Sequence, residues 1–495
     1  MLKTKEQYRE NIYNMRANVY IGGDAVKRDD HRLEPGVNVM EKTFEFAQNP
    51  KFEKFATATS TVTGEQINRF VHLPQNAYDL MQKQKYIRVA ARRVGGCIQR
   101  CMGLDGTIAL AVYTKEADNA NGTDYHERFL NYLKTVHQND LSLTCAQTDI
   151  KGDRLLRPSK QPNPEAYVKI VEKRDDGIVV SGMKMSITAV AYVEEFLVLP
   201  TRALMEDDHD YAVAFSIPAD AEGVSLITRP VWHRDKDDPD ASPFCKFGVS
   251  DSVVVLDNVF IPKERVFMCE EWKFGRRLAL LFADSHRHSY SGCKPAVSDI
   301  ICGTTALAAE ANNIHKVSHI REKMTEFASA AELAFAAGTA AAVYGEETAS
   351  GVFFPNTIYA NVGRKLTGET IYHEYNLLTE IAGGISVTLP FNEDFQQGDN
   401  VDLLKKFIVR NPDISPEASL KIWKLVESVG ASSMSDWYKI AGVHGGGSPI
   451  MEAIALGIEY DFEDKKAVAR FLAGIDEELD DSDLASLEPT WGDKS

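Results

Sequence analysis

The sequence predicts an α+β fold with three consecutive parts: an N-terminal helical domain, a β-rich middle domain and a C-terminal helical bundle. Apolar residues recur at helical spacing over residues 1–147, short β-rich runs fill 148–275, and helical spacing returns over 276–475. A chain of 495 residues with 44% hydrophobic content can also build two or three packed layers or domains.

The N-terminal part contains a long helix candidate at residues 78–114, where helix-breaking residues are few. The polar segment NANGTDYH at 119–126 interrupts the pattern, and a helix is expected again over 127–138. We therefore expect a largely helical first domain that ends near residue 147.

The middle part begins with TDIKGDRLLRPSKQPNP at 148–164, whose charge, proline and glycine predict a loop. Five or six short β-rich runs follow, and turn signals such as Asp175-Asp176-Gly177 separate them. Strands at this spacing favour an antiparallel barrel or sandwich. The order of helices, strands and bundle is that of acyl-CoA dehydrogenase-like flavoproteins, so we expect an antiparallel β-barrel; this analogy concerns the fold alone.

The C-terminal part is rich in alanine, especially over residues 298–344, which is typical of a packed helical bundle. After Ile475 the chain becomes strongly acidic. We expect this tail, residues 476–495, to be a solvated or disordered end.

Charge and composition exclude several classes of function. The formal net charge of -17 would repel a phosphate backbone, so we expect no nucleic-acid partner. The N-terminus has no apolar signal region, and no stretch reaches about 18 consecutive apolar residues, so we expect a cytoplasmic protein without a membrane span. Seven cysteines, an odd number, indicate reduced thiols or metal ligands rather than a disulfide framework.

Two short motifs offer metal-ligand chemistry. Cys97 and Cys101 are four residues apart on a predicted helix, which would place both thiols on one face. His286 and Cys293 are seven apart, nearly two helical turns, so they also share a face. Three thiols and one imidazole suit a tetrahedral zinc or an iron–sulfur cluster, and spacing does not choose between them. The alternative is buried core cysteines beside a hydrogen-bonded histidine.

Three loops have the chemistry of a cofactor site. Residues 147–154 precede Thr188 by about forty positions, and their hydroxyl, amide and glycine backbone groups could hold a flavin edge or a pyrophosphate; a domain-joining turn is the alternative. HGGGSP at 444–449 must be a loop, because three glycines destabilise a helix. Gly383-Gly384 is a weaker case and is also explained by a helix end. No Rossmann, Walker A, zinc-protease or nucleophile-elbow motif occurs.

Together these pieces resemble the 4-hydroxybutyryl-CoA dehydratase/vinylacetyl-CoA Δ-isomerase family, within the 4-hydroxyphenylacetate 3-hydroxylase superfamily. The resemblance runs almost end to end. It is carried by INRFVHL (67–73), CIQRCMGLD (97–105), TDIKGDR (148–154), LDNVFIP (256–262), HRHSYSGCK (286–294), AGGISVTLP (382–390) and HGGGSP (444–449).

The resemblance implies a homotetrameric enzyme with one non-covalent FAD and one 4Fe–4S cluster per subunit. It would dehydrate 4-hydroxybutyryl-CoA to crotonyl-CoA by a radical mechanism and isomerise vinylacetyl-CoA. The implied cluster ligands are Cys97, Cys101, His286 and Cys293. The implied catalytic residues are His286, Tyr290, Lys294, Thr188 and Asp251. The implied flavin contacts are Gln147, Thr148, Asp149, Gly152, Asp153, Arg154, Thr188, Gly383, Gly384, His444, Gly445 and Gly446.

Two positions depart from the family pattern. The family has glutamate where this chain has Asp251 and where it has Ala441. The first change shortens a carboxylate and the second removes one. If these carboxylates transfer protons, the changes affect which substrate is used or whether the full dehydration takes place. A related hydroxyacyl-CoA dehydratase or isomerase, a flavin-dependent aromatic monooxygenase of the same fold, and a protein with a purely structural zinc are the alternatives.

Overall fold

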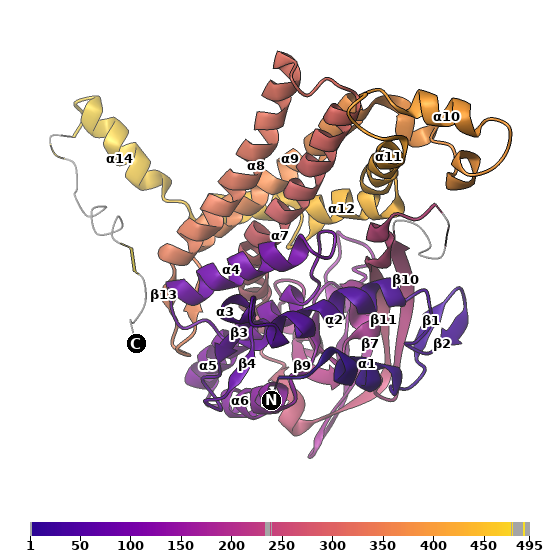
Figure 1. Ribbon diagram of the computed structural model, residues 1–495. Coiled ribbons are helices and arrows are strands. Elements are labelled where there is room, and N and C mark those ends of the chain that lie inside the picture. The colour runs from indigo at the N-terminus through magenta and orange to yellow at the C-terminus, as the bar shows by residue number, and fades with distance from the viewer. Residues whose placement is uncertain (1, 233–237, 239, 477, 479–488, 491–495) are drawn as a thin grey trace.

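The computed structural model describes the chain except residues 1, 233–237, 239, 477, 479–488 and 491–495, so the predicted acidic tail lies almost entirely outside the described residues. The predicted order of helices, strands and bundle is confirmed (Figure 1). The N-terminal helices are α1 (Lys5–Tyr13), α2 (Glu34–Gln48), α3 (Glu53–Ala56), α4 (Ala77–Ala91), α5 (Cys101–Asn121) and α6 (Tyr125–Asn139).

The strands form two main sheets. The six-stranded sheet has the order β2 (Asp24–Val26), β1 (Val19–Ile21), β10 (Val224–Trp232), β11 (Gly248–Pro262), β7 (Gly177–Thr188) and β6 (Lys169–Arg174). The four-stranded sheet has the order β12 (Val266–Cys269), β9 (Val213–Pro218), β8 (Glu195–Val198) and β5 (Leu143–Ala146). Two small hairpins complete the set: β3 (Thr57–Thr59) with β4 (Gln66–Asn68), and β13 (Glu346–Glu347) with β14 (Phe353–Phe354).

The predicted barrel is not confirmed, because over the described residues both sheets have an open strand order. The strands within the middle part pair antiparallel, as expected. However, the N-terminal part contributes β1 and β5, and each pairs in parallel with a strand of the middle part, β10 and β8 respectively. These pairings join residues about fifty to two hundred positions apart, which local sequence patterns do not reveal.

The C-terminal helices form the bundle seen in the upper half of Figure 1. They are α7 (Gly275–Ala311), α8 (Ser318–Val343), α9 (Thr357–Ala382), α10 (Val401–Ile408), α11 (Pro416–Gly430), α12 (Ser433–His444), α13 (Pro449–Glu459) and α14 (Phe462–Leu472). None of the described helices combines the length and the apolar character that crossing a membrane requires.

Helix α7, with 37 residues, connects two hydrophobic cores. Its first turns, including Leu278 and Leu281, pack with α4, α5 and α6, whereas Val297 and Ile301 pack with α9, α11 and α12. Between these apolar stretches, residues 284–294 are mostly polar and nevertheless buried. Buried polar groups need hydrogen-bond or ionic partners. Polar interactions are therefore expected along this middle segment, where the rest of the helix has apolar packing.

The single helix predicted over residues 78–114 is wrong, because the chain leaves the helix at residue 92 and re-enters it at Cys101. Gly95, Gly96 and Gln99 adopt φ values of 82°, 132° and 66°, which no helix accommodates. A side chain at Gly96 would also collide with the Tyr438 ring, since an added Cβ lies 2.6 Å from it. Cys97 therefore lies in a loop. A turn, and not a shared helical face, brings Cys97 and Cys101 close to each other.

Two glycines give a matched test of the packing. In Gly103→Ala, the new Cβ would lie 2.4 Å from the Leu143 carbonyl oxygen, so α5 and β5 must separate. We expect a loss of about 1–3 kcal/mol and a lower midpoint of thermal unfolding. In Gly303→Ala, on the exposed face of α7, nothing lies within 4 Å. We expect a gain of about 0.5–1 kcal/mol there from helix propensity. Equal midpoints would contradict the contact between α5 and β5.

Candidate functional site

A buried carboxylate, Asp105, lies at the centre of the candidate site. Lys83 Nζ from α4 lies 2.6 Å from its Oδ1, and the hydroxyls of Ser285 and Ser289 from α7 donate to the same oxygen at 2.8 and 3.0 Å. His286 Nδ1, also on α7, donates to Oδ2 at 2.8 Å. Burial alone would raise the pKa of Asp105, but the charge of Lys83 and the bond from His286 hold it well below the ordinary range.

The bond to Asp105 fixes the orientation of the His286 ring. With Nδ1 engaged, Nε2 is the nitrogen available to a metal or to a substrate proton. A carboxylate behind a histidine is the arrangement that metal-ligating histidines commonly have. Ligand atoms of Cys101, Asp105 and His286 all lie within 4.8 Å of one another, although 185 residues separate Cys101 from His286.

The three predicted cysteine ligands gather around this histidine. Burial raises the pKa of Cys97, Cys101 and Cys293, and each thiol also raises the pKa of a neighbouring one. The charge of Arg364 acts in the opposite direction on Cys293. Repulsion of this kind acts only at short range, so the three thiols lie near one another. Thiolates at such a site require a compensating cation, which a metal centre supplies. The ligand roles themselves remain a prediction.

The turn between Cys97 and Cys101 is held from two sides by residues that sequence reasoning missed. Gln99 Nε2 donates to the Gly248 carbonyl at 2.7 Å, and Tyr192 donates its hydroxyl to Gln99. On the other side, the Arg100 guanidinium lies over the Phe44 ring at 4.6 Å.

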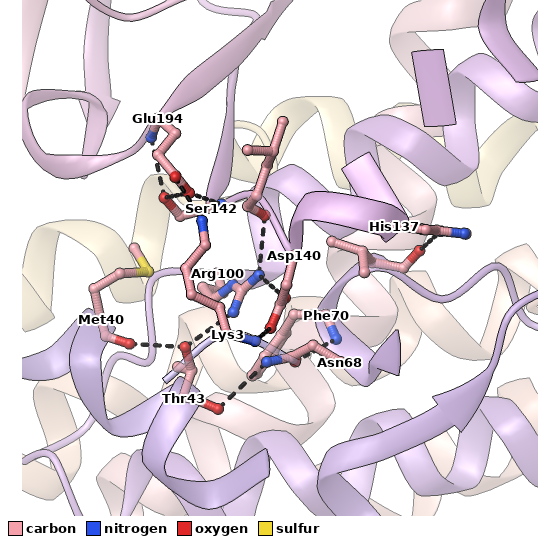
Figure 2. A network of polar contacts seen from close by, with 12 residues as sticks. Lys3, Met40, Thr43, Asn68, Phe70, Arg100, His137, Asp140, Ser142 and Glu194 are labelled. Atoms are coloured by element: carbon pink, nitrogen blue, oxygen red, sulfur yellow. Dashed lines mark hydrogen bonds and ion pairs between the residues drawn. The ribbon is translucent and has the colours of Figure 1, made fainter. Parts of the chain in front are cut away.

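Figure 2 shows the Arg100 guanidinium among the polar groups of the N-terminal part. It donates to Thr43 Oγ1 and to the Leu141 carbonyl, both at 3.1 Å, and lies 3.6 Å from Asp140. Asp140 in turn accepts from the backbone N–H of Lys3. The cysteine turn is thus anchored to the start of the chain as well as to β11.

Tyr290 joins the candidate metal site to the glycine loop. Its ring lies edge-on to His286 at 5.4 Å, and its hydroxyl donates to the Ala441 carbonyl at 2.6 Å. The HGGGSP segment is the predicted loop, with His444 as the last, exposed residue of α12. Only glycine fits at 445, because an added Cβ would lie 1.7 Å from the Tyr290 oxygen.

Two buried arginines hold the glycine loop against the bundle. Arg364 Nε donates to the Gly445 carbonyl at 2.6 Å, and Arg287 Nε donates to the Gly446 carbonyl at 3.0 Å. Position 446 also approaches the histidine, since an added Cβ would lie 3.6 Å from His286 Cδ2. The loop therefore covers one side of the metal site.

Lys294 and Asp251, two predicted catalytic residues, have buried partners. Lys294 Nζ lies 2.7 Å from Glu374 and donates to Ser298 at 2.8 Å. Asp251 accepts from the Thr188 hydroxyl at 2.6 Å and from the Trp437 indole at 2.8 Å, and burial raises its pKa. Thr188 and Asp251 face each other because β7 and β11 pair at these positions.

The first residues of the predicted flavin loop form contacts with other parts of the fold. Asp149 lies 2.8 Å from the buried Lys184, which also donates to the Gln147 carbonyl, and the Thr148 carbonyl accepts from Met185. In contrast, Gly152, Asp153 and Arg154 are exposed.

Gly383 and Gly384 are also exposed, and Gly383 caps the end of α9. Arg364 contacts the site near the start of this helix. The rise of an α-helix places Gly383 about 28 Å further along the axis. Within one chain these two glycines therefore do not join the metal site.

Comparison with known proteins decides the family. The chain matches the models for the 4-hydroxyphenylacetate 3-hydroxylase N terminal over residues 4–268 and C terminal over 276–474. It is 36% identical over 492 residues to 4-hydroxybutyryl-CoA dehydratase/vinylacetyl-CoA-Δ-isomerase from Clostridium aminobutyricum, with 96% of this chain and 100% of that protein covered. The chain belongs to this dehydratase/isomerase family. The resemblance predicted from the motifs is thereby confirmed.

Solved structures agree with this assignment. An oxygen-tolerant archaeal 4-hydroxybutyryl-CoA dehydratase from N. maritimus superposes with a TM-score of 0.92 at 34% identity, covering 100% of this chain and 98% of that one. HpaB, the oxygenase component of 4-hydroxyphenylacetate 3-monooxygenase in complex with FAD, superposes with a TM-score of 0.85 at 23% identity, covering 96% and 98%. The second likeness shows that dehydratase/isomerase family members and these oxygenases share a fold.

The position of Asp105 generates a prediction. In Asp105→Asn, the side chain loses the charge that opposes Lys83 and accepts less strongly from His286. We expect the affinity for iron to fall about 10–100-fold, measured by titrating bound iron with a chelator. Ser289→Ala removes one hydroxyl donor but leaves the carboxylate and its bond to His286, so iron binding should change little. Equal losses in the two variants would show that Asp105 does not act through His286.

Proposed function

We propose that the chain is a 4-hydroxybutyryl-CoA dehydratase that also isomerises vinylacetyl-CoA to crotonyl-CoA, with an acyl-CoA as its substrate. The proposal is supported by the closeness of Cys101, Asp105 and His286, and by the chain matching a protein of that name over that protein's whole length. Cys97 and Cys293 lie near enough to the other thiols for each to raise a neighbour's pKa. The monooxygenases of the same fold are more distant, such as the oxygenase component from Thermus thermophilus at 25% identity over 82% of this chain.

The donor set fits a 4Fe–4S cluster. The buried thiol of Cys101, the half-buried thiols of Cys97 and Cys293 and the Nε2 of His286 would supply four ligands, and Asp105 supports the imidazole from behind. FAD is the second proposed cofactor, bound non-covalently between the β-rich middle and the bundle. When bound, the flavin supplies one-electron redox chemistry and the cluster supplies a Lewis acid for the departing hydroxyl.

The side chains of the site then have separate tasks. His286 Nε2, which Asp105 leaves free, would take a proton from the substrate, and Asp105 would stabilise the resulting positive charge. Tyr290 fixes the glycine loop through the Ala441 carbonyl, and the loop keeps water from the reacting atoms. Thr188 and Asp251 form a hydrogen-bonded pair on the strand side, where a flavin edge would meet them. Lys294, held by Glu374, keeps a positive charge beside Cys293.

A homotetramer would complete the flavin site. Helix α14 extends away from the body of the chain in Figure 1, and α13 and α14 expose Ile450, Ile458, Phe462 and Leu472. Apolar surface of this extent is typical of subunit interfaces. We propose that neighbouring subunits bury these helices, and that Gly383, Gly384 and His444, which lie apart from the metal site or are exposed in one chain, contact a flavin shared between subunits.

Cofactor analysis tests the proposal. Protein purified without oxygen should contain iron, acid-labile sulfide and FAD in fixed ratio to the chain, and should convert 4-hydroxybutyryl-CoA to crotonyl-CoA. Zinc without sulfide would indicate a structural metal site. Flavin without iron, together with hydroxylation of a phenol, would indicate the monooxygenase instead.

The missing glutamate at Ala441 gives a second test. A positioned acid or base contributes about 10²–10⁴-fold to a rate, and isomerisation of vinylacetyl-CoA involves no leaving hydroxyl. We expect the native protein to form crotonyl-CoA from both substrates, and Ala441→Glu to accelerate dehydration more than isomerisation. Ala441→Gln, of similar size but without the acid, is the control. Rapid isomerisation by the native protein without detectable dehydration would show that the chain is mainly an isomerase.

A further inference from the structure

Arg364 on α9 is fully buried, yet much of its guanidinium has no partner. Its Nε donates to the Gly445 carbonyl, and Glu452 Oε1 lies 3.4 Å from the same nitrogen. Neither Nη1 nor Nη2 has a hydrogen-bond partner among the residues that the structure describes. Glu452 does not close the pair, since its Oε1 also lacks a hydrogen bond.

Other large buried arginines of this chain behave differently. Arg287 donates from Nη1 to Asp284 and Asn361, and Arg100 donates from both Nη atoms. Arg28 donates from both Nη atoms as well. A buried cationic group with unsatisfied donors is strongly unfavourable unless an anion compensates it. The free edge of Arg364 therefore points to an anionic ligand.

The groups around Arg364 indicate which anion it would bind. Its guanidinium carbon lies 4.6 Å from the centre of the Tyr290 ring, which in turn packs edge-on against His286. Its charge acts on Cys293 and on Tyr290. Apart from Glu452, the cysteines are the groups in this region that can collect negative charge, because coordinated cysteines are thiolates.

We propose that Arg364 is the counter-charge of the metal centre, with its Nη groups directed to the thiolate-ligated cluster while its Nε holds the glycine loop over it. The inference rests on the proposed function, because the anion is the assembled cluster. A fixed positive charge beside an anionic cluster stabilises the reduced form and so raises the reduction potential. Arg364 is a positioning residue, since it acts on the cluster and not on the substrate.

Stability with and without the cluster tests the proposal. In the apoprotein both Nη groups are buried without an acceptor and only Glu452 opposes the charge, so Arg364→Gln should unfold at the same temperature as the native apoprotein or above it. After reconstitution with iron and sulfide the order should reverse, and the variant should bind iron about 10–100-fold more weakly. Arg28→Gln is the matched control, because Arg28 is equally buried but both of its Nη groups already have acceptors, and this variant should be less stable in both states.

The reduction potential of the reconstituted cluster gives a second readout that a merely structural role would not move. Arg364→Gln should shift it to more negative values, and Arg364→Lys, which keeps the charge, should restore most of the native value. The inference would be overturned, and the proposed function left intact, by one result: Arg364→Gln is destabilised equally with and without cluster, and its cluster has the native potential. Native protein that binds no metal at all would overturn both the inference and the proposed function.

Discussion

The charge of one buried carboxylate organises the centre of this molecule. Asp105 is fully buried, and it is tolerated as an anion because Lys83 and three donors from α7 surround it. Its partners come from α4 and α7, so one side chain of α5 ties together three helices. The same carboxylate sets the direction in which His286 presents its free nitrogen. The packing of these three helices and the orientation of His286 therefore both depend on the interactions that offset the charge of Asp105.

The long α7 helix makes this balance possible. Its ends are apolar and belong to different hydrophobic cores, so both sides of its polar middle are fixed by apolar packing. A polar segment held in this way can present several functional groups without becoming mobile. His286, Tyr290 and Cys293 all lie on that segment, within two turns of one another.

Helical periodicity was enough to predict the three-part order and the shared face of His286 and Cys293, because these features depend on local spacing. The break at Gly95-Gly96 was missed, since two glycines followed by apolar residues also occur in helices. The Tyr438 ring from a distant helix is what excludes a side chain at Gly96. The anchoring roles of Asp105, Gln99 and Arg364 left no local signal either. Each acts through residues far away in the sequence, as do the parallel strand pairs that replace the expected barrel.

The separation of the ligand pairs has a consequence for biosynthesis. Ribosomes add about 5–20 residues per second, so roughly 10–40 s pass between the synthesis of Cys101 and that of His286. The covering loop at Gly445 follows still later. For the proposed metal centre, a nascent chain would carry two unligated thiols for much of its translation, and the full set of proposed ligands would not exist until the bundle has emerged. Delivery of the proposed metal would therefore follow synthesis of nearly the whole polypeptide, and the cellular machinery that supplies it would meet an almost finished fold.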